Sequence, residues 1–143
     1  MGSHLEPGGY LELQDNLFPI SCDDGTLTAD SPLMKWTHLL VEATDKMGRP
    51  ITVAPTFKKM LEDAGFDDVV ETKYRYPHAP WTKDPKLKEL GRWTQAGALQ
   101  GVEAMTLALF TRVLGWSQEE TLVFCSQVRN ELKSTKVHGL WDL

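Results

Sequence analysis

Asp15 is the first residue of this 143-residue sequence whose position could give it a chemical role. It follows Tyr10-Leu11-Glu12-Leu13-Gln14, where apolar and polar side chains alternate as they do in a short strand. Ligands gather at the carboxyl ends of strands in open α/β sheets, so Asp15 is a candidate catalytic residue. The alternative is a loop carboxylate that caps a turn.

Aromatic side chains are densest between residues 74 and 93. Flat rings bury a large area at a small cost in side-chain entropy, and they therefore suit a planar ligand. His78 lies in the same stretch and could transfer a proton. Core filling is the alternative role for this group. With one tryptophan from an earlier helix, the candidate binding residues are Trp36, Tyr74, Tyr76, Trp81 and Trp93.

The remaining motif classes are absent from the sequence. Its four histidines and two cysteines, Cys22 and Cys125, never approach the spacing of zinc ligands, so we expect no metal. There is no nucleophile elbow and no phosphate-binding loop. The formal net charge of -5 and the lack of a Lys/Arg cluster argue against nucleic-acid binding. A small molecule or another protein is the expected partner.

Composition also bears on where the protein works. Two distant cysteines suit a reducing compartment, and no apolar run approaches the ~18 residues of a membrane span. We therefore expect a cytoplasmic protein that does not bind membranes. Residues 1–4, Met-Gly-Ser-His, are typical of an expression scar, which leaves residues 5–143 as one domain.

The elements that must position these residues begin with the strand at 10–15. Asp23-Asp24-Gly25-Thr26 predicts a tight turn. A helix should then start at Asp30-Ser31-Pro32 and end at Gly48, because Leu33, Trp36, Leu40, Ala43 and Met47 recur at helical spacing. A shorter helix is expected from Phe57 to Ala64. Residues 68–76 alternate as a second strand, which Pro77 and Pro80 should end.

The last third of the sequence predicts helices. A short segment at 87–90 precedes a long helix at about 95–114, which carries only Glu103 as a charge before Arg112. So apolar a helix should be buried in a core or an interface. Ser117 and Glu120 form a capping box for a final helix that reaches about Lys133. His138 and Trp141 are expected in a frayed terminus. The predicted fold is α+β and predominantly helical, with few short strands.

Several of these motifs, taken in order, resemble the C-terminal half of class I S-adenosylmethionine-dependent methyltransferases, specifically the fungal LaeA-like family. The resemblance covers nearly the whole chain. It is carried by Leu5-Glu6-Pro7-Gly8-Gly9-Tyr10-Leu11-Glu12-Leu13-Gln14-Asp15, Gly48-Arg49-Pro50, Leu61-Glu62-Asp63-Ala64-Gly65-Phe66, Pro80-Trp81, Lys86-Leu87-Lys88-Glu89-Leu90-Gly91 and Leu114-Gly115-Trp116-Ser117.

The resemblance implies a Rossmann-like parent fold that uses S-adenosylmethionine. In that family the region after the strand at 10–15 borders the acceptor pocket, so His38 could be a general base, with a helix–helix contact as the alternative. The cofactor site of the family is a glycine-rich turn after a strand, and nothing in this sequence matches it. Gly97 and Gly101 are the nearest pair, but no strand precedes them. We therefore expect that this chain alone binds no cofactor.

These features lead to one expected function and two alternatives. The first is a truncated methyltransferase-like protein of secondary metabolism that keeps a pocket for a polyketide-like or indole acceptor but does not methylate alone. The second is a cofactor-independent cyclase or isomerase. The third is a binding or assembly module. An uncovered strand edge and the apolar helix predict a homodimer, or a partner that supplies missing strands.

Overall fold

A computed structural model describes residues 6–143; the proposed expression scar at residues 1–4 and Leu5 lie outside the described residues. The elements follow the chain as β1 (Leu17–Ser21), α1 (Pro32–Lys46), the 3-10 turn η1 (Ala54–Thr56), α2 (Phe57–Asp63), β2 (Arg75–Pro77), α3 (Pro85–Arg112), α4 (Gln118–Lys133) and β3 (Leu140–Asp142). The expectation of a predominantly helical α+β fold is confirmed.

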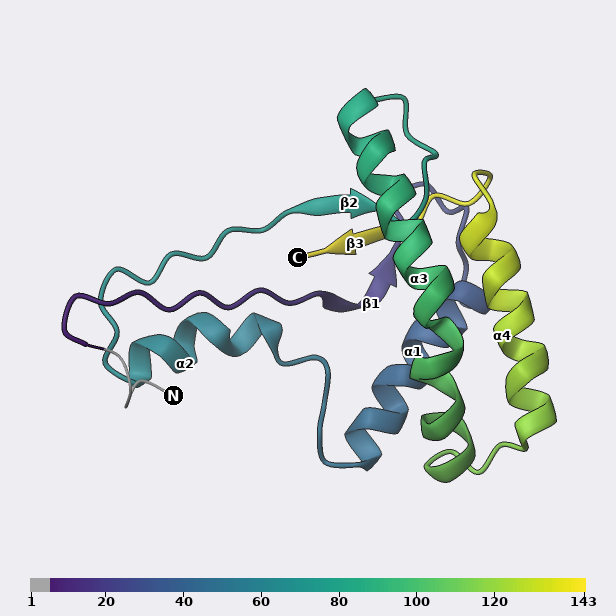
Figure 1. The fold of residues 1–143 in the computed structure, drawn as a ribbon, viewed down its shortest axis with the longest axis horizontal. Helices are drawn as coiled ribbons and strands as arrows, with labels where there is room; N and C mark the ends of the chain where they lie inside the picture. Colours follow the sequence, from purple (N-terminus) through teal and green to yellow (C-terminus); the bar gives the residue numbers. More distant parts are fainter. Residues whose placement is uncertain (1–5) are drawn as a thin grey trace.

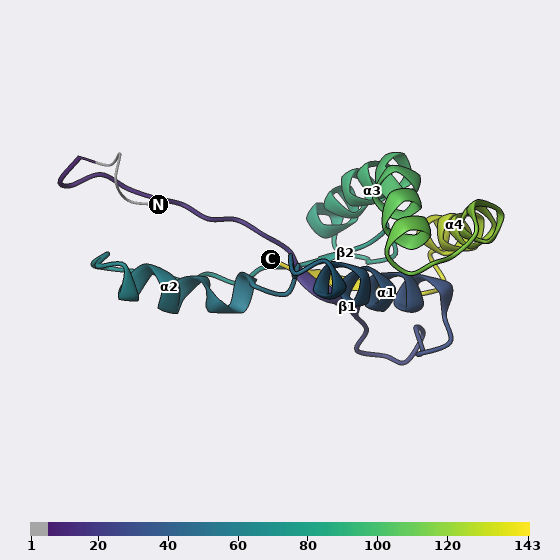
Figure 2. The ribbon, with the colours of Figure 1, turned by 90° about the horizontal axis from the view of Figure 1, so that it is seen from below.

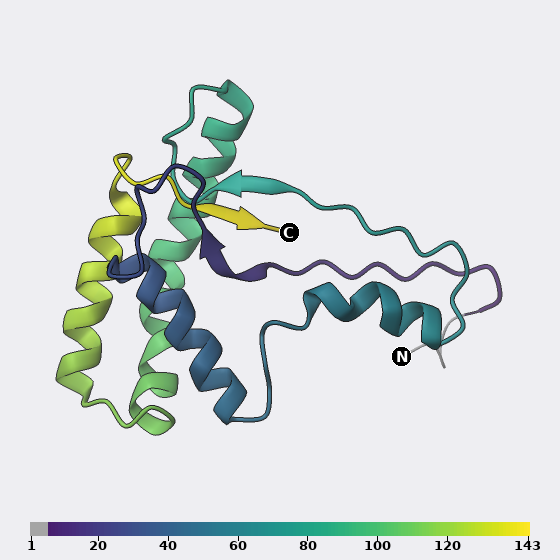
Figure 3. The ribbon, with the colours of Figure 1, turned by 180° about the vertical axis from the view of Figure 1, so that it is seen from behind.

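Two parts of the molecule are distinct in Figure 1. A body contains α1, α3, α4 and a small sheet, with α3 and α4 on one side of the sheet (Figure 2). An arm, formed by residues 6–16 and 51–74 with α2, projects from one end of the sheet (Figures 1 and 3). The carboxyl end of the chain lies where the arm meets the body.

The sheet is antiparallel and has the strand order β1-β3-β2. Strand β3 therefore lies between two strands that come before it in the chain. Leu17 pairs with Asp142 on one side, and Tyr76 pairs with Trp141 on the other. Trp141 is buried and meets the ring of Phe18 edge-to-face at 5.3 Å. The prediction of a frayed terminus at His138 and Trp141 is therefore wrong, because backbone pairing on both sides holds this segment.

The core is made by the inner faces of α1, α3 and α4. Trp36 of α1 is 2% exposed, and its indole N–H donates to Thr106 Oγ1 of α3 at 2.8 Å. Phe110 of α3 stacks on Phe124 of α4, with ring centroids 5.8 Å apart. The hydrophobic residues buried in this cluster are Ile20, Leu27, Leu33, Trp36, Leu40, Val102, Phe110, Phe124, Val128, Leu132 and Trp141.

Helices α1, α2 and α4 begin and end close to the predicted positions. Ser117 accepts a hydrogen bond from the Glu120 N–H at 3.0 Å, as one half of the capping box requires. The first turn of α1 is completed by another helix, because Glu131 Oε1 of α4 accepts from the Leu33 N–H at 2.7 Å. This contact spans 98 residues of sequence and fastens α1 to α4.

Helix α3 starts about ten residues earlier than predicted. Asp84 caps it by accepting from the Lys86 and Leu87 N–H groups at 2.9 and 3.1 Å, and Pro85 occupies the first turn. The helix then passes through Gly91 without a break, where it touches the backbone of Ala79. The predicted short segment at 87–90 and the long helix are thus one element.

The predicted strands at 10–15 and 68–76 are only partly correct. Both segments run extended through the arm, but pairing with β3 is confined to Leu17–Ser21 and Arg75–Pro77, and Tyr74 exchanges two further backbone hydrogen bonds with Leu143. Pro77 does not end the second strand, because it pairs with Leu140. The alternating pattern identified the extended chain correctly, whereas the position of β3 decides which residues are paired.

Candidate functional site

The main candidate site is a cleft in the arm, which we call the arm cleft. It lies between residues 9–15 and 66–74, beside α2, and has a cavity of about 370 Å³. Leu143 lines its inner end, where the arm meets the sheet. The volume lies within the ~300–1,000 Å³ of small-molecule sites.

Two of the predicted site residues come together in this cleft. Asp15 and Tyr74 both line it, and both side chains are exposed. Tyr76, two residues further along the chain, is half-buried and donates its phenolic O–H to Asn16 Oδ1. Burial raises the pKa of Tyr76, and the hydrogen bond to Asn16 partly offsets this. The lining of the cleft therefore includes the Asp15 carboxylate and the Tyr74 phenol, whereas Tyr76 and Asn16 are not among its lining residues.

His78 and Trp36 lie in the interior instead. His78 is fully buried beside two backbone carbonyls, with Nδ1 3.4 Å from the Gly139 oxygen and Nε2 3.3 Å from the Glu131 oxygen. Burial lowers the pKa of His78, although both carbonyls act in the opposite direction. The buried imidazole connects β2 to α4 and β3, while Trp36 fills the core. Neither residue lines the arm cleft.

His38, Trp81 and Trp93 are separated from the arm cleft as well. His38 is on the exposed face of α1, and Trp93 of α3 is 72% exposed. Trp81 is half-buried and donates its indole N–H to the Gly139 oxygen at 3.2 Å. The predicted aromatic group is thus divided: Tyr74 lies in the arm cleft, Trp36 in the core, Trp81 in a half-buried position and Trp93 on the exposed surface of α3.

Sequence reasoning missed a cluster around Asp24. Its carboxylate accepts from the Thr26 N–H at 3.1 Å and contacts His138 Nδ1, while the His138 ring stacks on Trp81 at 4.6 Å. The hydrogen bond with His138, followed by those with Thr26, holds the pKa of Asp24 well below its usual value. The cluster fastens the 22–27 turn to the start of β3. The Asp-Asp-Gly-Thr turn was the available signal.

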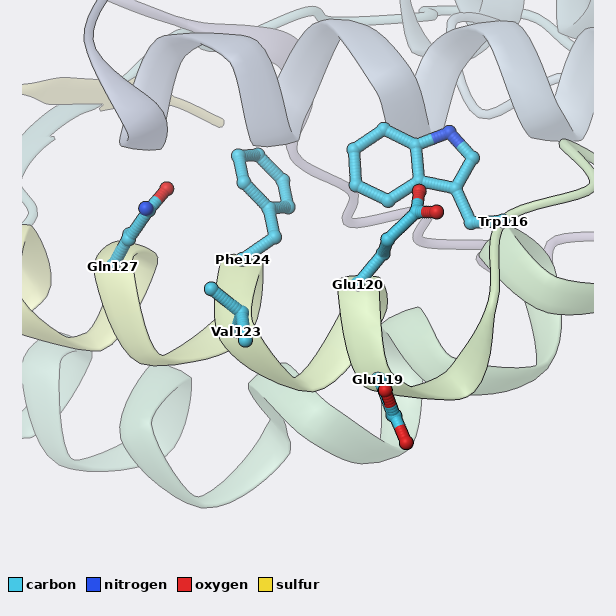
Figure 4. A pocket seen from close by; sticks show the side chains of 6 residues that line it. All are labelled: Trp116, Glu119, Glu120, Val123, Phe124 and Gln127. Atoms are coloured by element: carbon cyan, nitrogen blue, oxygen red, sulfur yellow. The ribbon is translucent and has the colours of Figure 1, made fainter.

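A second hollow, of about 470 Å³, lies on the surface of α4 (Figure 4). Trp116 and Phe124 are directed toward the neighbouring helix, and Glu119 points away from it. The two aromatic rings are 5.4 Å apart and continue into the core. None of the predicted site residues lines this hollow.

The described residues do not fit S-adenosylmethionine. Proteins of this class bind the cofactor through free backbone N–H groups at a glycine-rich turn that follows a strand. The turn after β1 contains Gly25, but there the Thr26 N–H is already bonded to Asp24. Gly97 and Gly101 lie inside α3. Within residues 6–143, no three potential ligand side chains gather to hold a metal ion, and no helix has the length and apolar character to cross a membrane.

Comparison with known proteins finds relatives along nearly the whole chain. The protein named methyltransferase pytC, from Aspergillus terreus, is 41% identical over 140 residues, which are 98% of this chain and 43% of that protein. The probable methyltransferase tdiE of Emericella nidulans is 40% identical over 141 residues, 99% of this chain and 44% of that protein. This chain is a homologue of fungal methyltransferases.

The same homology extends to regulators. The secondary metabolism regulator LAE1 of Cochliobolus heterostrophus is 39% identical over 139 residues, or 96% of this chain and 45% of that protein. The resemblance to LaeA-like fungal proteins is therefore confirmed. This homologue spans less than half the length of these relatives. No family model matches it, and no solved structure does.

Proposed function

We propose that this chain forms the acceptor side of an S-adenosylmethionine-dependent methyltransferase-like protein of secondary metabolism. The observation that carries the proposal is the 41% identity to methyltransferase pytC over 98% of the chain. Since the described residues do not fit the cofactor, the cofactor would be held by another part of such a protein. The chain alone should then bind an acceptor without methylating it.

The acceptor contacts are assigned to the inner end of the arm cleft. Tyr74 offers an exposed ring that can stack on a planar polyketide-like or indole acceptor. Asp15 lies in the same cleft and could take the proton that an acceptor hydroxyl loses. His38 remains a candidate base on the neighbouring body.

Acceptor binding can be tested with a planar aromatic probe. Saturation-transfer NMR of the purified chain with 1-naphthol should show contact, and Tyr74→Ala should reduce it several-fold. Trp93→Ala is the matched control, because Trp93 is an exposed aromatic residue outside the cleft. Equal losses in the two variants would show that the probe binds exposed rings indiscriminately and would contradict the assignment.

Turnover assays separate the alternative functions. The probe and candidate polyketides should be recovered unchanged after incubation with the chain, whether or not S-adenosylmethionine is added. Conversion without the cofactor would identify a cyclase or isomerase, and methylation by the chain alone would refute the proposal. Self-association is the third alternative, and it predicts a dimer mass in light scattering.

A further inference from the structure

The hollow on α4 is lined by one continuous segment of the chain. Its lining residues all fall within residues 116–127, where Glu120, Phe124 and Gln127 follow one another at helical spacing along about three turns. In Figures 1 and 3 helix α4 lies on the side of the body away from the arm. The walls of the hollow are therefore complete within this segment.

The aromatic rings of the hollow are held in place from within the body. The rings of Trp116 and Phe124 line it, and Phe110 of α3 packs against both, at 4.9 Å and 5.8 Å between ring centroids. The Trp116 backbone N–H also donates to the Phe110 carbonyl oxygen at 2.9 Å. Because packing already fixes these rings, a partner would bind there with little further loss of side-chain entropy.

An exposed valine extends this apolar surface. Val123 lines the same hollow and is 61% exposed. Valine forms helices less readily than alanine or leucine, so the stability of α4 does not account for its presence on the outer surface. Contiguous exposed apolar side chains are typical of a surface that contacts another protein. Together with Trp116 and Phe124, Val123 therefore marks a contact surface.

The charged side chains that line the hollow are both acidic. They are Glu119 and Glu120, and Glu120 extends from α4 on the same side as Trp116 and Phe124 (Figure 4). Among residues 6–143, neither carboxylate forms an ion pair. The helix dipole favours acidic side chains in a first turn, but it leaves their charge in place. A partner with positive charge would therefore be favoured here.

We propose that the hollow on α4 binds a basic amphipathic helix of a partner protein. The apolar face of that helix would cover Val123 and the two aromatic rings, and its basic residues would lie beside Glu119 and Glu120. Helices bind apolar grooves through anchor residues at helical spacing, which matches the three turns that line the hollow. Apolar contact supplies most of the affinity, because exposed ion pairs contribute little, whereas the two carboxylates select a basic partner. This proposal does not depend on the acceptor contacts in the arm cleft.

The probe for this proposal is a fourteen-residue synthetic peptide of leucine and lysine, with its leucines at helical spacing on one face. In an NMR titration it should shift the backbone amide signals of residues 116–127 and leave those of residues 6–16 in the arm unchanged. A leucine–glutamate peptide of the same pattern should bind at least ten-fold more weakly. Equal binding of the two peptides, or shifts spread over other acidic surfaces, would overturn the proposal.

Two double variants separate this site from general attraction to an acidic protein. Glu119→Gln combined with Glu120→Gln should weaken binding of the lysine peptide about five-fold. The matched control is Glu62→Gln combined with Asp63→Asn, which removes the same charge from an exposed acidic pair on α2 and should change binding less than about two-fold. Equal effects of the two double variants would refute the assigned site.

A third comparison tests the apolar contact. Val123→Ser should weaken binding of the lysine peptide several-fold, whereas Val70→Ser, at an exposed position in the arm, should not; circular dichroism checks both folds. Unchanged binding by Val123→Ser would contradict the proposal. A dimer mass in light scattering without peptide, lost in Val123→Ser, would show that a second copy covers the hollow and would also overturn it.

Discussion

Gly91 and Gly97 lie on the same helix, α3, and should respond in opposite ways to the same substitution. A Cβ atom at Gly91 would lie 2.4 Å from the Ala79 carbonyl oxygen and 2.7 Å from its carbon. Ordinary contact begins at 3.4 Å, so the helix or the 79–80 backbone must move by about 1 Å. At Gly97 no atom lies within 4 Å of the added carbon.

These distances set the expected free energies of unfolding. Alanine in place of an exposed helical glycine stabilises by about 0.5–1 kcal/mol, so Gly97→Ala should raise the free energy of unfolding by that amount. Gly91→Ala has the same backbone gain but strains tightly packed backbone, at about 1–3 kcal/mol or more. Its net effect should be a loss of about 1–2 kcal/mol, which separates the two variants by roughly 2 kcal/mol.

Urea unfolding followed by circular dichroism measures this difference directly. The midpoints of the two variants should lie on opposite sides of the wild-type midpoint, separated by about 1 M urea. Similar slopes would show that the unfolded states are comparable. If Gly91→Ala is as stable as Gly97→Ala, then α3 does not touch the 79–80 backbone and the account of this contact is wrong.

Three further predictions concern contacts between distant segments. Glu131→Ala should lower the free energy of unfolding by urea by about 1–3 kcal/mol, because it leaves the Leu33 N–H without its acceptor. Glu131→Gln should lower it less, and equal losses in the two variants would contradict the capping role. Burial lowers the pKa of His78 below 6.5, so the unfolded chain binds the proton more readily and the free energy of unfolding should fall as the pH drops below 6.5. Thermal melts over a pH series should show that the melting temperature of His78→Asn depends less on pH, and an unchanged pH dependence would contradict this prediction. Trp141→Ala should lower the free energy of unfolding by about 3–5 kcal/mol, whereas Trp93→Ala, at an exposed position, should lower it by less than about 0.5 kcal/mol. Equal melting temperatures for the two variants would contradict the burial of Trp141 in the sheet.

The helices were largely predictable from sequence because their signals are local. Apolar residues at helical spacing define α1, and Ser117 marks the start of α4 within one turn of sequence. The start of α3 was missed although Asp84-Pro85 is a local cap, because residues 87–90 were interpreted as a separate short segment before the long helix.

The sheet and the site were harder to predict because they depend on distant segments. Alternation identified extended chain at 10–15, but it could not show that β3 pairs with Leu17–Ser21 instead. Asp15 and Tyr74 both line the arm cleft, whereas the place of His78 in the core depends on Gly139 and Glu131, more than 50 residues away. Single-sequence patterns contain no information on such pairs.

The central position of β3 has a consequence for the order of folding. Its partners precede it in the chain, yet Ser21 and Leu140 are separated by more than 100 residues of sequence. Strands β1 and β2 therefore have no strand between them until residues 140–142 have been made. Local helices can form during synthesis, whereas contacts between distant residues are slow to form. A ribosome-bound chain that lacks residues 138–143 should therefore hold helical structure with an unclosed sheet, and completion of β3 would be the step that commits the body to its native topology.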